Sequence, residues 1–185
     1  MRNFILGVIF VLVLLLLCAL GGALLGFMPT SANATPPAWE ARIASGALDA
    51  SMERHAPRIN NPVPATDANL IDGMKVYTMN CALCHGGLDK KPSALQHSMY
   101  PQPPQLVLEP LDDPEWHIFF ATRTGVRYTG MPAWERVLSE QDLWKVTGFL
   151  SRIDKLPAGA KEYWQKNFNV SPEPSGEHHK HEDHD

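Results

Sequence analysis

The strongest constraint on this chain is an uncharged apolar run of 24 residues, from Phe4 to Phe27. A helix of that length is about 36 Å long, which is enough to cross the roughly 30 Å hydrocarbon core of a bilayer. The run therefore predicts a transmembrane helix. Arg2 precedes it and the next charged residue is Glu40, which favours export of the rest of the chain. We expect a single-pass protein of the inner membrane whose remaining residues lie in the periplasm.

A cleaved signal peptide is the alternative interpretation of the same segment. Ala32-Asn33-Ala34 matches the small-residue pattern that precedes cleavage. The apolar region of a signal peptide is usually about 7–15 residues long, however, which is shorter than this run. The length favours an uncleaved anchor over residues 1–28, and under both interpretations the rest of the chain is exported.

Composition divides the rest of the chain into a spacer, a compact domain and a tail. Residues 29–65 contain six prolines, which is typical of a semi-rigid spacer. Within the spacer, the proline-free stretch from Ala38 to Arg54 predicts a short helix, which lies either at the bilayer surface or against the next domain. Residues 171–185 are rich in histidine and acidic residues, so we expect a disordered tail.

The compact domain, residues 66–170, shows helix signals and no sustained alternation of polar and apolar residues. Capping signals predict helices from Thr66 or Asp67 toward Gly86, from Asp113 as N-cap to Gly125, from Ser139 to about Ile153, and from Ala160 to Phe168. The fold class is therefore all-α. About 100 residues with such long loops bury little surface by themselves, so we expect something other than protein to fill the centre.

The segment Cys81-Ala82-Leu83-Cys84-His85 indicates the nature of that group, because C-x-x-C-H is the attachment pattern for c-type haem. Cysteines three positions apart at a helix end share one face, so both sulfurs can bond one porphyrin while His85 offers a nitrogen to the iron. A structural disulfide would not explain the histidine. A zinc site would need a second pair of ligands, and the third cysteine, Cys18, lies in the apolar run. We expect one covalently bound haem c.

Four downstream residues are candidates for the second axial ligand: His97, Met99, His117 and Met131. Met131 is favoured because it lies between a glycine and a proline in a loop, which can bring its thioether to the iron from the face opposite His85. His117 falls within a predicted helix, where a packed or surface histidine is more typical. His97 and Met99 lie in the proline-rich loop and are expected on the same side as His85.

In combination these motifs resemble the monohaem class I cytochromes c, and especially the membrane-anchored branch related to the haem subunits of cbb3-type oxidases. The resemblance covers about residues 68–156 and rests on C-A-L-C-H-G, P-P-Q-L, T-G-M-P-A-W and D-L-W-K-V-T-G-F-L. It implies a class I cytochrome c fold around one haem. In that fold the first and last helices cross almost perpendicularly, here with Gly73 and Tyr77 against Val146 and Phe149.

The resemblance also implies roles for individual residues. Cys81 and Cys84 attach the haem, while His85 and Met131 bind the iron. The Pro104 carbonyl accepts the other ring N–H of His85, and Leu106 packs on the porphyrin. Tyr128 and Trp134 are expected in the haem pocket. Apart from the resemblance, Arg123 and Arg127 flank the turn that leads to Met131, which makes them candidate propionate partners. Pro103 stands where the family usually has glycine, so the resemblance does not define the path of that loop.

The expected function is transfer of one electron rather than catalysis, because a filled sixth position leaves no open iron site. The expected partners are the membrane and respiratory proteins: a quinol-oxidising complex, a terminal oxidase, a reductase or a dehydrogenase. Lys+Arg 16 against Asp+Glu 20 argues against nucleic-acid binding. Two alternatives stay open: a haem peroxidase or gas sensor in which the Met131 bond is labile, and a metal-handling protein that uses the four histidines of the tail.

Overall fold

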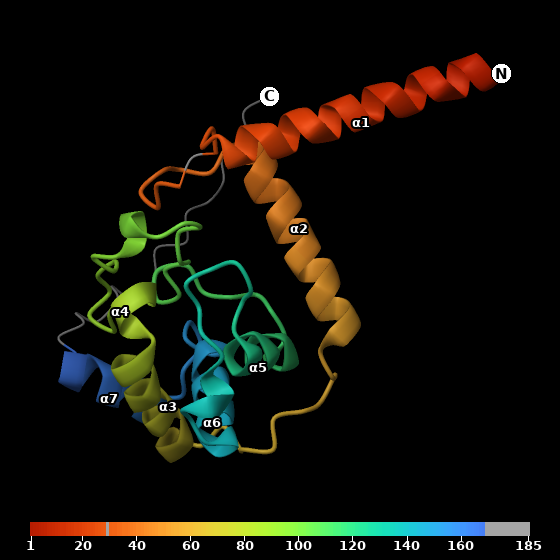
Figure 1. The fold of residues 1–185 in the computed structure, drawn as a ribbon. Coiled ribbons are helices and arrows are strands. Elements are labelled where there is room, and N and C mark those ends of the chain that lie inside the picture. The colour runs from red at the N-terminus through yellow and green to blue at the C-terminus, as the bar shows by residue number, and fades with distance from the viewer. Residues whose placement is uncertain (29, 169–185) are drawn as a thin grey trace, which may run out of the picture. The chain divides into compact units, whose positions relative to one another are not determined.

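The computed structural model describes residues 1–28 and 30–168, and this part of the chain contains helices and loops but no strand (Figure 1). The all-α prediction is therefore confirmed. Contacts divide the chain into two units, Met1–Ala32 and the residues from Asn33 onward. The tail, residues 171–185, lies outside the described residues, together with the predictions of its disorder and metal binding.

The first unit consists of one long helix, α1 (Arg2–Leu24), and the turn after it. No side chain of α1 is buried. The helix is long and apolar enough to cross a membrane, as a retained anchor or a signal sequence would be. It ends shortly before Gly26, whose φ of 82° is typical of a helix terminator. The predicted apolar helix is confirmed.

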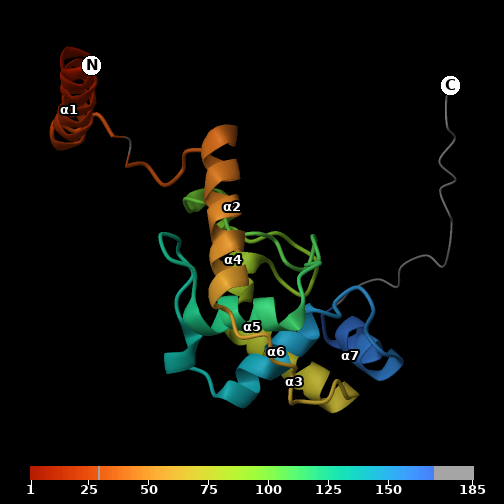
Figure 2. The ribbon, with the colours of Figure 1, turned by 90° about the vertical axis from the view of Figure 1, so that its right-hand side faces the viewer.

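The second unit begins with α2 (Ala38–His55), which starts directly after Pro37. Met52 is buried near the end of this helix, and Ala56, just after it, is buried as well. The Arg58 guanidinium lies 5.4 Å from the ring centroid of Trp116, a residue of α5 (Glu115–Thr124). The end of α2 thus packs against α5, as the two views also show (Figure 2). Of the two expected positions, the structure supports the one against the domain.

The centre of the domain is the contact between α3 (Asp67–Asn80) and α6 (Glu140–Leu150). Both helices start as predicted: the Thr66 hydroxyl accepts from Asn69 N–H, and the Ser139 hydroxyl accepts from Asp142 N–H. Gly73 makes the close approach possible, because a Cβ there would lie 2.3 Å from the Lys145 carbonyl oxygen. The rings of Tyr77 and Phe149 meet edge to face, with centroids 5.8 Å apart.

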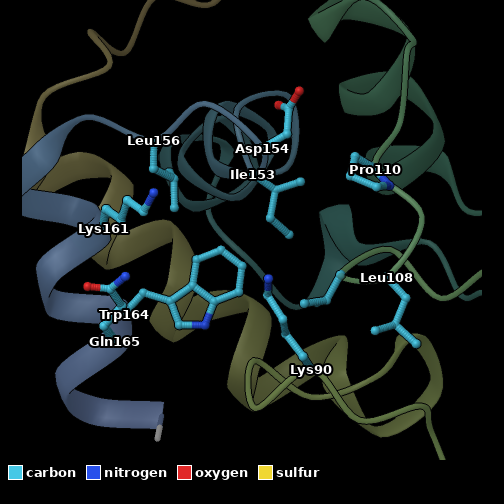
Figure 3. Close-up of a pocket in the computed structure, with 10 residues that line it drawn as sticks. Lys90, Leu108, Pro110, Ile153, Asp154, Leu156, Lys161, Trp164 and Gln165 are labelled. Atoms are coloured by element: carbon cyan, nitrogen blue, oxygen red, sulfur yellow. The ribbon is translucent and has the colours of Figure 1, made fainter. Parts of the chain in front are cut away.

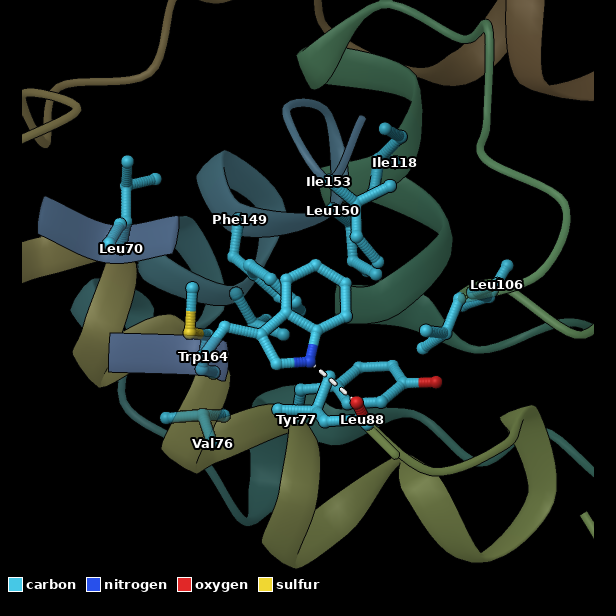
Figure 4. Packing of buried hydrophobic residues seen from close by; sticks show 14 residues of the cluster. Leu70, Val76, Tyr77, Leu88, Leu106, Ile118, Phe149, Leu150, Ile153 and Trp164 are labelled. Carbon is cyan, nitrogen blue, oxygen red and sulfur yellow. Dashed lines mark hydrogen bonds between the residues drawn. The ribbon is translucent and has the colours of Figure 1, made fainter. Parts of the chain in front are cut away.

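A further helix, α7 (Ala158–Phe168), completes this core. Its Trp164 is buried and donates an indole hydrogen bond of 2.5 Å to the Leu88 carbonyl (Figure 4). Leu88 lies three residues beyond the haem-attachment motif, so α7 fixes the chain just after that motif.

Several predicted helix limits differ from the structure. The first helix, α3, ends at Asn80 instead of continuing toward Gly86, because Cys81 with its φ of −110° departs from helical geometry, and α7 starts at Ala158 instead of Ala160. The N-cap of α5 is Pro114, with ψ of 152°, rather than Asp113. The helix starts later because the Asp113 carboxylate lies 2.8 Å from the His117 ring instead of capping the first turn. The helix α6 ends at Leu150 rather than near Ile153, because Ser151 and Arg152 continue in tight turns with N–H bonds to Thr147 and Phe149.

Candidate haem site

The attachment motif occupies a single helical turn at the end of α3. That helix stops at Asn80, and α4 (Ala82–His85) continues after Cys81. The backbone N–H groups of Cys84 and His85 both donate to the Cys81 carbonyl, at 3.1 Å and 2.9 Å. The two thiols are free and half-buried. Burial, with a smaller contribution from Cys84, raises the pKa of the Cys81 thiol to about 12, so this sulfur is protonated at neutral pH.

The imidazole of His85 is held by the segment that the resemblance singled out. Its Nδ1 lies 2.8 Å from the Pro104 carbonyl oxygen, which leaves Nε2 as the nitrogen for a metal. The Leu106 N–H donates to the His85 carbonyl at 3.1 Å. Both the side chain and the backbone of His85 are therefore hydrogen-bonded to the segment from Pro104 to Leu106. Burial lowers the pKa of His85 and the bond to Pro104 opposes the shift, which favours the neutral ring that binds metals.

Tyr77 has a second role beside its place at the helix crossing. Its buried hydroxyl lies 3.0 Å from the His85 carbonyl and 2.8 Å from the Gly86 carbonyl. The packing of α3 on α6 therefore also fixes the turn that presents the histidine. Desolvation raises the pKa of this phenol, so it stays a hydrogen-bond donor at physiological pH.

Gln105 is a site residue that the sequence analysis missed. Its side chain is 3% exposed, and its amide donates to the carbonyls of Cys84 at 3.2 Å and Pro103 at 3.0 Å. Its amide oxygen accepts from Ser93 N–H at 2.7 Å. Glutamine is usually exposed, so nothing in the sequence marked this position. These bonds also show how the loop is held where Pro103 replaces the usual glycine.

The loop that carries Met131 is shaped by Gly125, which has a φ of 69°. A Cβ at Gly125 would lie 2.6–2.8 Å from backbone atoms of Met131, Pro132 and Ala133. The loop closes through Val126 N–H, which donates to the Met131 carbonyl at 3.2 Å, and Met131 N–H bonds the Thr129 hydroxyl at 3.1 Å. Hydrogen bonds and the close packing at Gly125 therefore restrain the backbone of the loop that carries the Met131 thioether.

The other candidate ligands have different surroundings. His117 is bonded to Asp113, which fits the expected packed histidine. His97 is exposed. Met99 contacts the Met131 loop: a Cβ on Gly130 would lie 2.0 Å from the Met99 methyl carbon. Met99 therefore lies beside the loop that carries the favoured ligand.

The remaining predicted pocket residues divide into two groups. Leu106 is buried in the core, and Trp134 packs against the buried cluster of Phe119, Leu143 and Trp144. Tyr128, in contrast, is 88% exposed, and its ring contacts the Arg127 guanidinium. The geometry gives no support to Tyr128 as a pocket residue. Arg123 pairs with Glu135 at 2.9 Å, so both arginines contact other side chains.

A hollow of about 250 Å³ lies elsewhere, beside Trp164, with Lys90 and Lys161 at its rim (Figure 3). None of the predicted haem residues lines it. Within residues 1–28 and 30–168 there is also no group of three or more His, Cys, Asp or Glu placed to hold a metal ion. The hollow is therefore not formed by the residues that are predicted to hold the haem.

The donors present fit haem c: two free thiols on one helical turn, an imidazole with Nε2 left available, and a thioether on a restrained loop. Comparison with known families agrees. Residues 68–150 match the family described as cytochrome C oxidase, cbb3-type, subunit III. No curated protein matches the chain.

These observations first define a class: the segment is a cytochrome c domain with a class I fold, which carries covalently bound haem c and transfers electrons. Within that class, residues 68–150 form a domain related to the haem subunits of cbb3-type oxidases.

Proposed function

We propose that this protein carries one electron on a single haem c whose iron is bound by His85 and Met131. The bond between His85 and the Pro104 carbonyl carries the proposal, because it orients the ring and leaves Nε2 for the iron. Met131 would supply the second ligand, and hydrogen bonds restrain the backbone of its loop. Cys81 and Cys84 supply the thiols for attachment.

The chain's own residues tune this site in three ways. When bound, the haem supplies an iron that alternates between Fe(III) and Fe(II). The Pro104 carbonyl accepts a hydrogen bond from the Nδ1–H of His85, which raises the basicity of the ring. The Met131 thioether is neutral and a weak donor, so it raises the reduction potential relative to a second imidazole. Buried Leu106 and Ile118 keep water away from the interior.

The arrangement along the chain suggests where the electron is exchanged. We propose that residues 1–28 are a retained anchor, 29–65 a spacer that includes α2, and 66–170 the haem domain in the periplasm. The partners are then respiratory proteins: a quinol-oxidising complex on one side and an oxidase, reductase or dehydrogenase on the other. The protein acts as a tethered carrier or as the haem subunit of such a complex, without enzyme activity of its own.

Substitution of Met131 tests the ligand assignment. Met131→Ala should retain covalent haem but become high-spin when ferric, bind CO when reduced, and lose the weak red-edge sulfur-to-iron band. Met131→His should stay six-coordinate and low-spin with a lower potential. Optical spectra of both oxidation states and a redox titration measure these properties.

The unmodified protein supplies the control, because a firmly bound sulfur resists CO. Rapid CO binding by the unmodified reduced protein would instead favour the peroxidase or gas-sensor alternative. Survival of the sulfur-to-iron band in Met131→Ala would show that another thioether binds the iron.

A further inference from the structure

A residue of α2, far from the haem motif in the sequence, is hydrogen-bonded to the proline-rich loop of the haem domain. Glu40 lies in the first turn of α2, outside the segment that matches the cytochrome family. Its carboxylate accepts a hydrogen bond from the hydroxyl of Tyr100, which lies 60 residues further along the chain. Both residues are half-buried. This bond ties α2 to the proline-rich loop of the haem domain.

The same loop contacts the residue before the proposed ligand. Met99 adjoins Tyr100, and its methyl group lies so close to Gly130 that a Cβ there would be only 2.0 Å away. Gly130 is bonded directly to Met131. Contacts therefore run without a gap from Glu40 through Tyr100 and Met99 to the loop that bears the thioether.

The helix that provides Glu40 is itself well supported. Met52 is buried near its other end, and Ala56 is buried just beyond it. Arg58 then covers Trp116 of α5, and the Asn61 amide donates to the Trp144 carbonyl at 3.1 Å. Because the C-terminal end of α2 packs on the domain, the rigid helix gives Glu40, about three turns away, a defined position beside the proline-rich loop.

We infer that α2 braces the axial-ligand loop, with Glu40, Tyr100 and Met99 as positioning residues that limit movement of Met131 away from the iron. The inference rests on the proposed Met131 ligation. The physical reason is that a single bond from a thioether to iron is weak, so the ligand stays in place only if the surrounding chain maintains its geometry. A hydrogen bond to a carboxylate and a close apolar contact restrict the outward motion of Gly130.

The test measures how fast imidazole replaces the sulfur ligand in the ferric full-length protein in detergent, followed by loss of the sulfur-to-iron band. Tyr100→Phe and Glu40→Ala should each accelerate replacement about threefold to tenfold, as expected for one hydrogen bond to a charged group at a half-buried position. The double variant should be no faster than the singles, because both remove the same bond. Asp49→Ala, which removes an exposed carboxylate from the same helix, is the control and should match the unmodified protein.

Substitutions of Met99 separate bracing from ligation. Met99→Leu retains an apolar side chain of similar size and should behave like the unmodified protein, whereas Met99→Ala should accelerate replacement. Urea midpoints should change little in all variants. This measurement is needed because a general loss of stability would also loosen the loop.

The failures of the two proposals differ. Unchanged replacement rates in Tyr100→Phe and Glu40→Ala, with the band still dependent on Met131, would overturn the brace alone. Loss of the band in Met99→Leu together with its survival in Met131→Ala would make Met99 the ligand and overturn the proposed ligation.

Discussion

Gly125 shows how a single residue determines the geometry of the ligand loop. Its φ of 69° lies in the region that L-residues rarely adopt, and its missing side chain leaves room for the backbone from Met131 to Ala133. The thioether position therefore depends on a residue six positions away in the sequence.

Gly125→Ala should accordingly disturb the site without disturbing attachment. The strained backbone conformation costs about 1–3 kcal/mol, and the Cβ would push the backbone of Met131 outward. We expect a weaker sulfur-to-iron band and faster CO binding after reduction, while the protein still stains for covalent haem. An unaltered band in a well-folded Gly125→Ala protein would mean that the loop tolerates another path.

At the scale of elements, the α3–α6 crossing positions the motif. Tyr77 lies in this crossing and bonds the carbonyls of His85 and Gly86, so helix packing is transmitted directly to the histidine. A salt bridge of 2.9 Å between Lys145 and Asp72 spans the same contact. The crossing thus combines an apolar centre with a polar edge.

Gly73→Ala should lower the free energy of unfolding by about 3 kcal/mol, because its Cβ would lie 2.3 Å from the Lys145 carbonyl oxygen and the helices must separate. Urea unfolding of the haem-loaded protein measures this. The matched control is Gly46→Ala in α2, where a Cβ meets nothing within 4 Å. That substitution should be neutral or stabilise by up to about 1 kcal/mol. Equal effects of the two substitutions would contradict the close-packed crossing.

At the scale of the whole molecule, α1 determines whether the haem domain diffuses freely. If the helix is a retained anchor, carbonate washing should leave the haem protein in the membrane fraction, and the mature chain should begin at or near Met1. A version that starts at Thr35 behind a cleavable leader should be released with the same visible spectrum. Isolation of a natural mature chain that begins at Thr35 would instead indicate a free shuttle.

The sequence by itself determined the features that depend on local chemistry. The apolar run, the capping residues Thr66 and Ser139, and the C-x-x-C-H spacing each involve only neighbouring residues, and hydrogen bonds and side-chain direction along one helix repeat predictably. The resemblance to cytochromes c predicted the remaining site residues, Met131 and Pro104. Its ligand assignments, however, stay predictions.

The tertiary structure decided the features that depend on residues far apart in the chain. Gln105 became a site residue because three backbone groups from different segments converge on its amide. Tyr128 is exposed, and Met99 lies against Gly130. Glu40 met Tyr100 across 60 residues. Such contacts arise from chain crossings, which no local pattern encodes, because their partners are selected by packing and not by spacing.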